Sequence, residues 1–309
     1  MSILNPAQTT VAREDVLEVG RIGAWVGLLA VEPAAQVREA AKALERAGYD
    51  VLWYGESVAR EAFGFGALLL EATDHVRIAS GIANLWARDA TAMHNGAATL
   101  AEASGGRFIL GIGVSHRPLV IGRGHDYRDP LGVMAEYLDA YDTALYRGPE
   151  PVHPAPLVLA ALGPRMLSLA SGRTCGAHSY FVPVEHTTMA RRVLGPGPWL
   201  AAEQAAVLSS DPVEARIIAH AHMETYLRLP NYRNNLSRLG WTPEDLDEVP
   251  DRLIDALIVW GGVGDIVERV AEHLRRGVDH VAVQLLPVSS GFPLRDYVSL
   301  APALAELQA

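Results

Sequence analysis

The sequence predicts a (β/α)8 TIM barrel that folds as one domain. Short apolar runs, typical of strands buried on both faces, alternate with amphipathic helical patterns along the chain. Eight such runs fit within 309 residues, and a closed barrel needs eight strands. No linker rich in Pro, Gly or Ser divides residues 1–309. A doubly wound open sheet is the alternative, because strand order cannot be read from a sequence.

The first half of the chain contains four of the expected strands. The helix after the first strand starts at Pro33, carries Val37 and Leu44 on one face and stops at Gly48. Residues 114–128, rich in Gly, Arg and His, are expected to form a loop. The strands are expected at 22–30, 50–54, 76–84 and 107–113, and further helices at 90–104 and 130–146.

The alternation continues in the second half. Residues 212–260 are mostly helical in pattern around a polar stretch at 229–241, so a helical insertion is expected at about 212–260. Residues 1–20 or so form an N-terminal extension. The strands are expected at 157–162, 177–183, 200–208 and 279–286, and the helices at 164–174, 186–194, 264–276 and 293–307.

Composition excludes several classes of protein. A net charge of −10 disfavours nucleic-acid binding, which depends on neutralising phosphates. No apolar run reaches the roughly 18 residues of a membrane helix, and the N-terminus lacks the features of a signal peptide. Cys175 is the only cysteine, which excludes an internal disulfide, and Lys42 is the only lysine. We therefore expect a cytoplasmic protein that acts on a small molecule, without a nucleic-acid or membrane partner.

Two patterns that would indicate other chemistries fail. Gly111 and Gly113 follow a strand, as in a dinucleotide-binding loop, but the third glycine of that motif would fall on His116. His220 and His222 are two residues apart on an expected helix and so point in different directions. No carboxylate cluster accompanies His116, and we expect no metal site.

The turn that leaves the fifth expected strand has the features of an anion site. Gly163 makes the turn, and Pro164 stands at the first helical position, which helix starts favour. The free N–H groups of a helix start attract phosphate, and Arg165 would add positive charge. An ordinary βα turn is the alternative.

In a barrel of this kind, functional residues lie at the carboxyl ends of the strands. Glu56 ends the second strand and is the best-placed carboxylate for proton transfer, with a solvated loop carboxylate as the alternative. Trp25, Trp53 and Trp86 lie on or just past the first three strands, where they either wall a flat ring or pack in the core. The strand-end residues to search are Glu56, 81–84, 113–116, 160–165, 177–180, Glu203 and Gln284.

Six segments together resemble the luciferase-like monooxygenase superfamily, and within it the F420-dependent oxidoreductases. Each motif is weak alone, whereas their order and spacing along nearly the whole chain are specific. The segments are RIG at 21–23, GYDVLWYGE at 48–56, IASGIAN at 78–84, GRFILGIG at 106–113, AALGPRM at 160–166 and GVDHV at 277–281. Residues 177–187 and 230–235 resemble an actinobacterial subgroup of F420-dependent enzymes.

The resemblance implies a luciferase-like barrel with a deazaflavin or flavin lying across the strand ends. It places a bulge with a non-prolyl cis peptide at Gly81-Ile82, behind the ring, and Asn84 at the ring edge. Gly113 would let the backbone approach the ring closely. The other cofactor-binding residues that it implies are Ser115, Ala161, Gly163, Pro164, Arg165, Ala177 and His178.

The resemblance also implies a reaction, namely hydride transfer between coenzyme F420 and a small organic substrate. His116 is the first candidate for the acid or base, because its ordinary pKa lies near neutral pH, and Glu56 is the second. Some relatives carry histidine directly after the acid of the second strand, where this chain has Ser57. With Lys42 in the first helix, no lysine remains for a sugar phosphate.

Two other functions remain open at this level. One is an FMN-dependent two-component monooxygenase of the luciferase-like type, and the other is a barrel that binds a cofactor or ligand without turnover. A separate F420 or flavin reductase would supply the reduced cofactor. Members of this superfamily often dimerise, so a homodimer is also expected.

Overall fold

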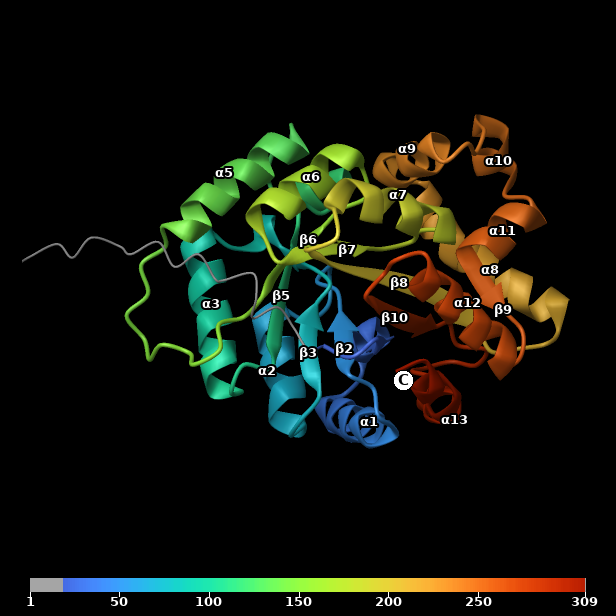
Figure 1. The fold of residues 1–309 in the computed structure, drawn as a ribbon, viewed down its shortest axis with the longest axis horizontal. Helices are drawn as coiled ribbons and strands as arrows, with labels where there is room; N and C mark the ends of the chain where they lie inside the picture. Colours follow the sequence, from blue (N-terminus) through green and yellow to red (C-terminus); the bar gives the residue numbers. More distant parts are fainter. Residues whose placement is uncertain (1–18, 309) are drawn as a thin grey trace, which may run out of the picture.

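A computed structural model describes residues 19–308 as a closed parallel barrel wrapped by helices (Figure 1). The order around the barrel is β1, β2, β3, β5, β6, β7, β8 and β10, and β10 pairs with both β8 and β1. This closure excludes the open sheet. The barrel strands are β1 (Ile22–Trp25), β2 (Val51–Tyr54), β3 (Arg77–Ser80), β5 (Phe108–Gly113), β6 (Leu157–Ala160), β7 (Gly176–Ser179), β8 (Trp199–Val207) and β10 (His280–Leu285).

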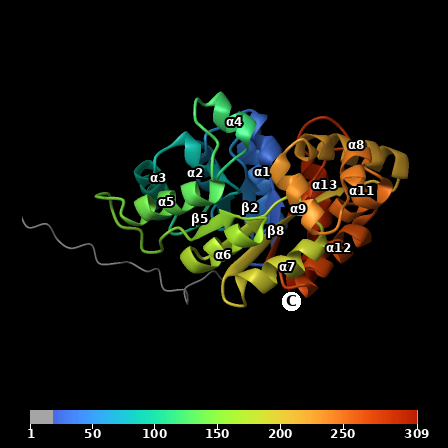
Figure 2. The same cartoon turned by 90° about the horizontal axis from the view of Figure 1, so that it is seen from above.

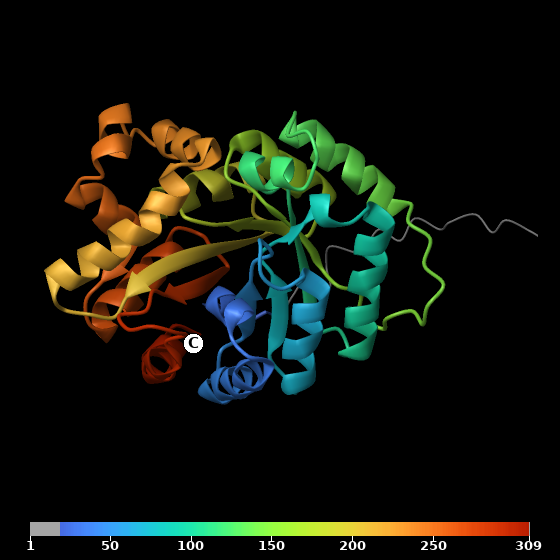
Figure 3. The ribbon, with the colours of Figure 1, turned by 180° about the vertical axis from the view of Figure 1, so that it is seen from behind.

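Helices cover the outside of the barrel (Figures 1 and 3). Those that follow barrel strands are α1 (Ala34–Ala47), α2 (Ala62–Ala72), α3 (Ala90–Ala103), α4 (Arg117–Gly122), α5 (Pro130–Asp142), α6 (Pro164–Arg173), α7 (Val184–Leu194), α12 (Val263–Arg275) and α13 (Leu294–Ala305). Within residues 19–308 the short 3-10 helices are η2 (Gly27–Val31), η3 (Leu85–Ala87) and η4 (Glu306–Gln308). None of the helices between residues 19 and 308 is both long and apolar enough to cross a membrane.

The helical insertion expected at about 212–260 consists of α8 (Pro212–Leu227), α9 (Pro230–Arg238), α10 (Pro243–Glu248) and α11 (Asp251–Leu257). It lies on the side of the barrel away from α3 and α5 (Figure 2). It packs on a core of its own, in which Leu236 and Leu253 are fully buried. The chain then forms the short strand β9 (Ile258–Trp260), which pairs with the end of β8.

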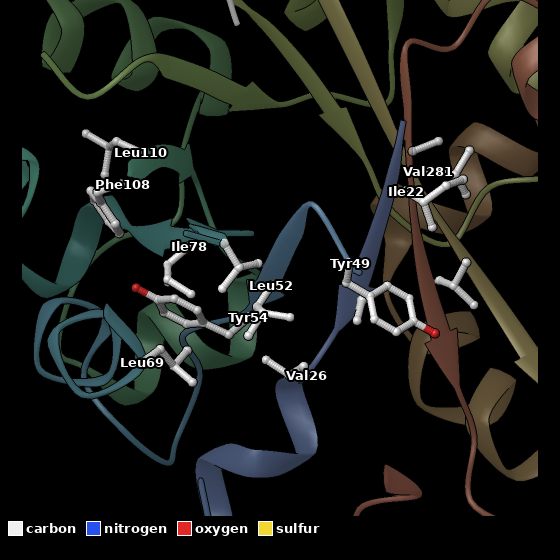
Figure 4. Packing of buried hydrophobic residues seen from close by; sticks show 14 of the residues in the cluster. Ile22, Val26, Tyr49, Leu52, Tyr54, Leu69, Ile78, Phe108, Leu110 and Val281 are labelled. Carbon is white, nitrogen blue, oxygen red and sulfur yellow. The ribbon is translucent and has the colours of Figure 1, made fainter. Parts of the chain in front are cut away.

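Local sequence explains the regular elements. In α1, Val37, Ala41 and Leu44 recur at helical spacing, and all three are fully buried. Gly48 ends this helix with φ of 93°, in the left-handed region that glycine adopts without strain. Figure 4 shows the layer between barrel and helices, where Leu52 and Tyr54 of β2 pack.

The barrel interior forms a separate core of alternating strand residues. It contains Trp53, fully buried and stacked on Trp199 at 5.9 Å between ring centroids. The Trp53 indole donates to Nε2 of His280 (3.0 Å), whose Nδ1 bonds the carbonyl of Gly20 (2.6 Å). Apart from residues 19 and 20, the expected N-terminal extension lies outside the described residues.

Several elements differ from the sequence prediction. The first strand was expected to reach residue 30 but ends at Trp25, and the apolar run continues as η2, which buries Leu29 instead. The run expected at 76–84 is interrupted after Ser80 and resumes as β4 (Ala83–Asn84). Strand β9 was missed because it is three residues long and follows a helix directly.

Candidate active site at the strand ends

The carboxyl ends of all eight barrel strands meet at one mouth, because every pairing in the barrel is parallel. The order of strands fixes which walls face each other. From β3, the path through β5, β6 and β7 and the path through β2, β1 and β10 both reach β8 in four steps. Strand β8 therefore stands opposite β3 across the mouth.

The β3 wall carries the expected bulge, and the peptide bond Gly81-Ile82 is cis, as the resemblance implied. Two main-chain bonds join the bulge to β2. The N–H of Gly81 donates to the carbonyl of Tyr54 (2.6 Å), and the N–H of Glu56 donates to the carbonyl of Ile82 (3.0 Å). A Cβ at Gly81 would lie 2.8 Å from the Trp25 ring, so only glycine fits against this tryptophan.

Glu56 supports the bulge from behind through both of its carboxylate oxygens. Oε2 accepts from the N–H of Asn84 (2.7 Å) and from Nη1 of Arg88 (2.9 Å). Oε1 accepts from the N–H of Ala62 (3.2 Å) and from Nη2 of Arg88. The carboxylate side chain is 3 % exposed and the guanidinium side chain 9 %. This arrangement favours a positioning role for Glu56 over the proton transfer expected from the sequence.

Asn84 and Gly113 lie side by side at the mouth, where β4 pairs with β5. The Asn84 Oδ1 accepts from the N–H of Trp86 (3.0 Å), while its buried Nδ2 has no hydrogen-bond partner in the described part of the chain. A Cβ at Gly113 would lie 2.6 Å from Cγ1 of Ile82. Gly113 therefore lies directly against the Ile82 side chain, and a buried amide donor without a partner lies beside the bulge.

His116 follows β5 and comes just before α4, after Ser115 in a left-handed turn with φ of 56°. Its ring lies 5.5 Å from that of Tyr232, and its side chain bonds that of Asn231. Burial lowers the pKa of His116, and Nδ1 has no partner within residues 19–308. The imidazole is therefore neutral at neutral pH and able to accept a proton.

The two residues expected on β7 point to opposite sides of the sheet, as neighbours on a strand do. Ala177 packs in the outer core. His178 points into the barrel, where its ring stacks on Trp53 at 4.5 Å and on Trp25 at 5.6 Å. Burial lowers the pKa of His178 to about 3, and neither ring nitrogen has a partner among the residues described. These rings form a neutral floor beneath the mouth.

The predicted anion site lies at the start of α6. Gly163 is the N-cap residue, Pro164 occupies the first turn and no side chain caps this end. Arg165 is exposed, and the N–H of Ala161 donates to the carbonyl of His178 (3.0 Å). Arg238 of α9 was not among the predicted site residues, yet its Nη2 lies 3.4 Å from where a Cβ of Gly163 would be.

Arg238 bonds Oδ1 of Asn235 (3.2 Å) and forms no ion pair with a carboxylate in the range 19–308. Its charge is therefore available to a ligand at this turn. The sequence signal for a binding role of Arg238 was weak. Arg238 belongs to the polar stretch 229–241, and the position of this stretch over the mouth depends on tertiary packing.

A cluster of tyrosines lies beside β8, and of its members only Tyr180 was among the strand-end residues to search. The Tyr226 hydroxyl bonds that of Tyr180 (2.7 Å), which donates to Oε1 of Gln284 (2.8 Å). Tyr232 lies against Tyr226 at 5.3 Å between ring centroids. Glu203 and Gln284 were among the expected strand ends but received no role, whereas Tyr226 and Tyr232 come from the insertion.

Two further features border the site. A cavity of about 210 Å³ opens beside Glu56, and Ser57, Arg60 and Arg123 are among the residues that line it. Trp86 is half-buried and donates its indole N–H to the carbonyl of Val114 (3.0 Å). No group of three or more potential metal ligands occurs in the described residues.

The comparisons with known proteins agree with this geometry. The sequence model of the luciferase-like monooxygenase family matches residues 15–280. A Mycobacterium tuberculosis protein described as a coenzyme F420-dependent oxidoreductase is 24 % identical over 349 residues, covering 92 % of this chain and all of the relative. A 5,10-methylenetetrahydromethanopterin reductase of Methanolobus tindarius is 26 % identical over 156 residues, covering 45 % of this chain and 48 % of the relative.

Solved structures share the fold. An F420-dependent secondary alcohol dehydrogenase with an F420–acetone adduct superimposes with a TM-score of 0.75 at 14 % identity, covering 92 % of this chain and 99 % of that one. The FMN complex of the oxygenating constituent of 3,6-diketocamphane monooxygenase from Pseudomonas putida gives 0.69 at 13 % identity, covering 93 % and 98 %. The resemblance seen in the sequence is thereby confirmed, and the chain belongs to the luciferase-like monooxygenase family.

Proposed function

We propose that the protein is an F420-dependent oxidoreductase that transfers a hydride between coenzyme F420 and a small organic substrate. The observation that carries this proposal is the buried, unpartnered amide of Asn84 beside the bulge between β3 and β4. Similarity to an F420-dependent relative over 92 % of the chain supports the choice of cofactor.

The residues at the mouth fit a deazaflavin with a phosphate-bearing tail. The bulge would back the flat ring, and Asn84 Nδ2 would offer it a hydrogen bond. The helix start at Gly163, with Arg238 beside it, would hold the phosphate. When bound in its reduced form, F420 supplies the hydride, whereas the protein contributes binding, orientation and proton transfer.

Each group of this chain then has a defined task. Glu56 and Arg88 keep the bulge in place from behind. Trp53 and His178 form a stacked, neutral floor that keeps water out of the barrel. His116 faces the mouth as a neutral imidazole and is the proposed base for the proton that reduced F420 would release as it gives up its hydride.

The FMN-dependent two-component monooxygenase is the second candidate. The observation that favours it is the shared fold with an FMN-binding oxygenase. The two cofactors present a similar ring to the bulge, so their relative affinities decide between the functions. In either case we propose that a separate reductase supplies the reduced cofactor.

A fluorescence titration of the purified chain with F420, and separately with FMN, tests the proposal. We expect F420 to bind with a Kd in the micromolar range or tighter, about −8 kcal/mol, and FMN to bind far more weakly. Asn84→Ala should raise the Kd for F420 roughly tenfold through the lost hydrogen bond. Asn95→Ala, on the outer helix α3, is the matched control and should leave it unchanged.

Other outcomes assign the other functions. Tight binding of FMN alone would move the assignment to the monooxygenase. Tight binding of F420, with no oxidation of reduced F420 by a panel of ketones, enones and cyclic imines, would indicate a barrel that binds without turnover. Binding of neither cofactor would refute the proposal.

A further inference from the structure

The carboxyl group of Glu203 is isolated within the β8 wall of the mouth. The residue is 1 % exposed, and its Oε2 accepts one bond, from the N–H of Phe181 (3.0 Å). Oε1 has no hydrogen-bond partner in residues 19–308, and no ion pair in that range involves Glu203. A buried carboxylate without a cation is costly, so the group stays protonated instead. Burial raises the pKa of Glu203 to about 8.

The groups around Glu203 are neutral as well. A charge on Glu203 would influence the pKa of four tyrosines from four different segments. Burial raises the pKa of each of these tyrosines. They are Tyr180 after β7, Tyr226 on α8, Tyr232 on α9 and Tyr297 on α13. His178, on β7 beside this wall, is uncharged at neutral pH, as its lowered pKa requires. None of these groups compensates a negative charge on Glu203.

The backbone around Glu203 is arranged to hold it. Phe181 has φ of 56°, a left-handed conformation that a bulky residue rarely adopts. This conformation accompanies the hydrogen bond from the Phe181 N–H to Oε2. Backbone outliers of this kind persist only where the surroundings enforce them, and they occur mostly at functional sites.

Position in the barrel relates Glu203 to the rest of the site. Strand β8 stands opposite β3, so Glu203 lies across the mouth from the bulge at Gly81-Ile82. If the bulge backs one face of the cofactor ring, the other face is turned toward the β8 wall. Tyr232, whose pKa is influenced by Glu203, also contacts the ring of His116. Tyr232 therefore lies against His116 and within the electrostatic influence of Glu203.

We propose that Glu203 is the catalytic acid that donates the proton accompanying hydride transfer when the substrate is reduced. This inference rests on the proposed function. The hydride comes from the reduced deazaflavin and bonds to the substrate carbon, and the π electrons move to the attached oxygen or nitrogen. The O–H bond of Glu203 breaks as a new bond from hydrogen to that heteroatom forms. The proton that the cofactor loses on oxidation passes to solvent, from which Glu203 is protonated again.

Infrared difference spectroscopy of the protein without cofactor tests the protonation of Glu203 directly. We expect a carboxylic C=O band at pH 7 that disappears as the pH rises, with a midpoint near 8. Glu203→Gln should abolish this band and should fold, because its amide oxygen can still accept from Phe181. Glu39→Gln, on the exposed side of α1, is the matched control and should retain the band. A Glu203→Gln protein that keeps the band would overturn the proposal.

Oxidation of reduced F420 by the ketone, enone or imine that the wild type reduces fastest tests the donor role. Wild-type turnover should be constant below pH 8 and fall tenfold per pH unit above it. Glu203→Gln should turn over at least 100-fold more slowly, without this fall, while binding F420 normally. Glu203→Asp should restore part of the rate.

Unchanged turnover in Glu203→Gln would overturn the donor role even if the infrared band is lost. Failure of the wild type to bind F420 would refute the proposed function and the donor role with it. In that case the infrared band would still report a neutral acid in the mouth, so the two failures are distinguishable. Should Glu203→Gln not fold, as judged by circular dichroism, Glu203→Asp and the titration of the wild-type band provide the same test.

Discussion

Replacing Arg88 with methionine would measure how firmly the β3 bulge is supported. The change removes the guanidinium that pairs with Glu56 and leaves a carboxylate that is 3 % exposed without a cation. Breaking a buried ion pair from one side costs about 3–5 kcal/mol. Glu56 keeps two main-chain donors, from Ala62 (3.2 Å) and Asn84 (2.7 Å), so we expect the lower end, about 3 kcal/mol.

Urea and thermal unfolding followed by circular dichroism would measure this loss. A cost of about 3 kcal/mol corresponds to a fall in Tm of roughly 5 °C or more for a chain of this size. Arg38→Met is the control, because Arg38 and Glu71 form a surface pair with side chains 44 % and 68 % exposed. Its loss should cost at most about 1 kcal/mol.

A double variant separates the pair from its surroundings. Glu56→Gln combined with Arg88→Met leaves no buried charge, so it should recover about 2 kcal/mol relative to Arg88→Met alone. The single variant should also raise the Kd for F420, because Asn84 and the bulge lose their support. A loss for Arg88→Met no larger than that of Arg38→Met would refute the positioning role of this pair.

Further predictions concern the mouth and its pH dependence. His116→Ala should slow oxidation of reduced F420 about 100-fold while changing the Kd for F420 less than twofold, and equal losses in both would contradict its role as a base. Arg238→Ala should raise the Kd for F420 about tenfold at low salt and less at high salt, whereas a salt-independent effect would contradict a phosphate contact. Glu203 has a raised pKa of about 8. Its contribution to the stability of the folded protein is therefore full below about pH 4 and is lost as the pH rises to 8. The urea midpoint of unfolding, measured at pH 5, 7 and 9, should decline in the wild type relative to Glu203→Gln. Burial lowers the pKa values of His178 and His280 to about 3 and 4. Their contribution to the stability of the folded protein is therefore present above about pH 6.5 and is lost in acid. His178→Phe should accordingly unfold at a lower pH than the wild type.

The order of strands and helices could be predicted because each barrel strand leaves a local signal. Apolar runs identified eight barrel strands, and Gly48 and Pro164 marked ends of helices correctly. The cis peptide at Gly81-Ile82 followed from the family resemblance rather than from periodicity. Periodicity failed at residues 26–30, because an unbroken apolar run does not distinguish a strand from the turn of η2 that buries Leu29.

For the candidate site, the sequence could predict only those positions that depend on single strand ends. Asn84 and Gly113 are at the mouth because β4 and β5 pair there. The contributions of Tyr226, Tyr232 and Arg238 depend instead on how α8 and α9 lie over the barrel, which no local pattern encodes. Glu203 was visible as a strand end, but its isolation results from aromatic side chains that come from distant segments.

The distribution of charge across the mouth limits what can bind there. Glu203, His116 and His178 are all held in their neutral forms at neutral pH, and the tyrosines around them are neutral too. The permanent charges stand at the edges, in the Glu56–Arg88 pair behind the bulge and at Arg238 beside α6. A charged substrate entering the centre would lose its hydration without gaining a counter-ion. A neutral carbonyl or imine loses far less, and the proton from Glu203 would neutralise the charge that develops on its heteroatom as hydride arrives.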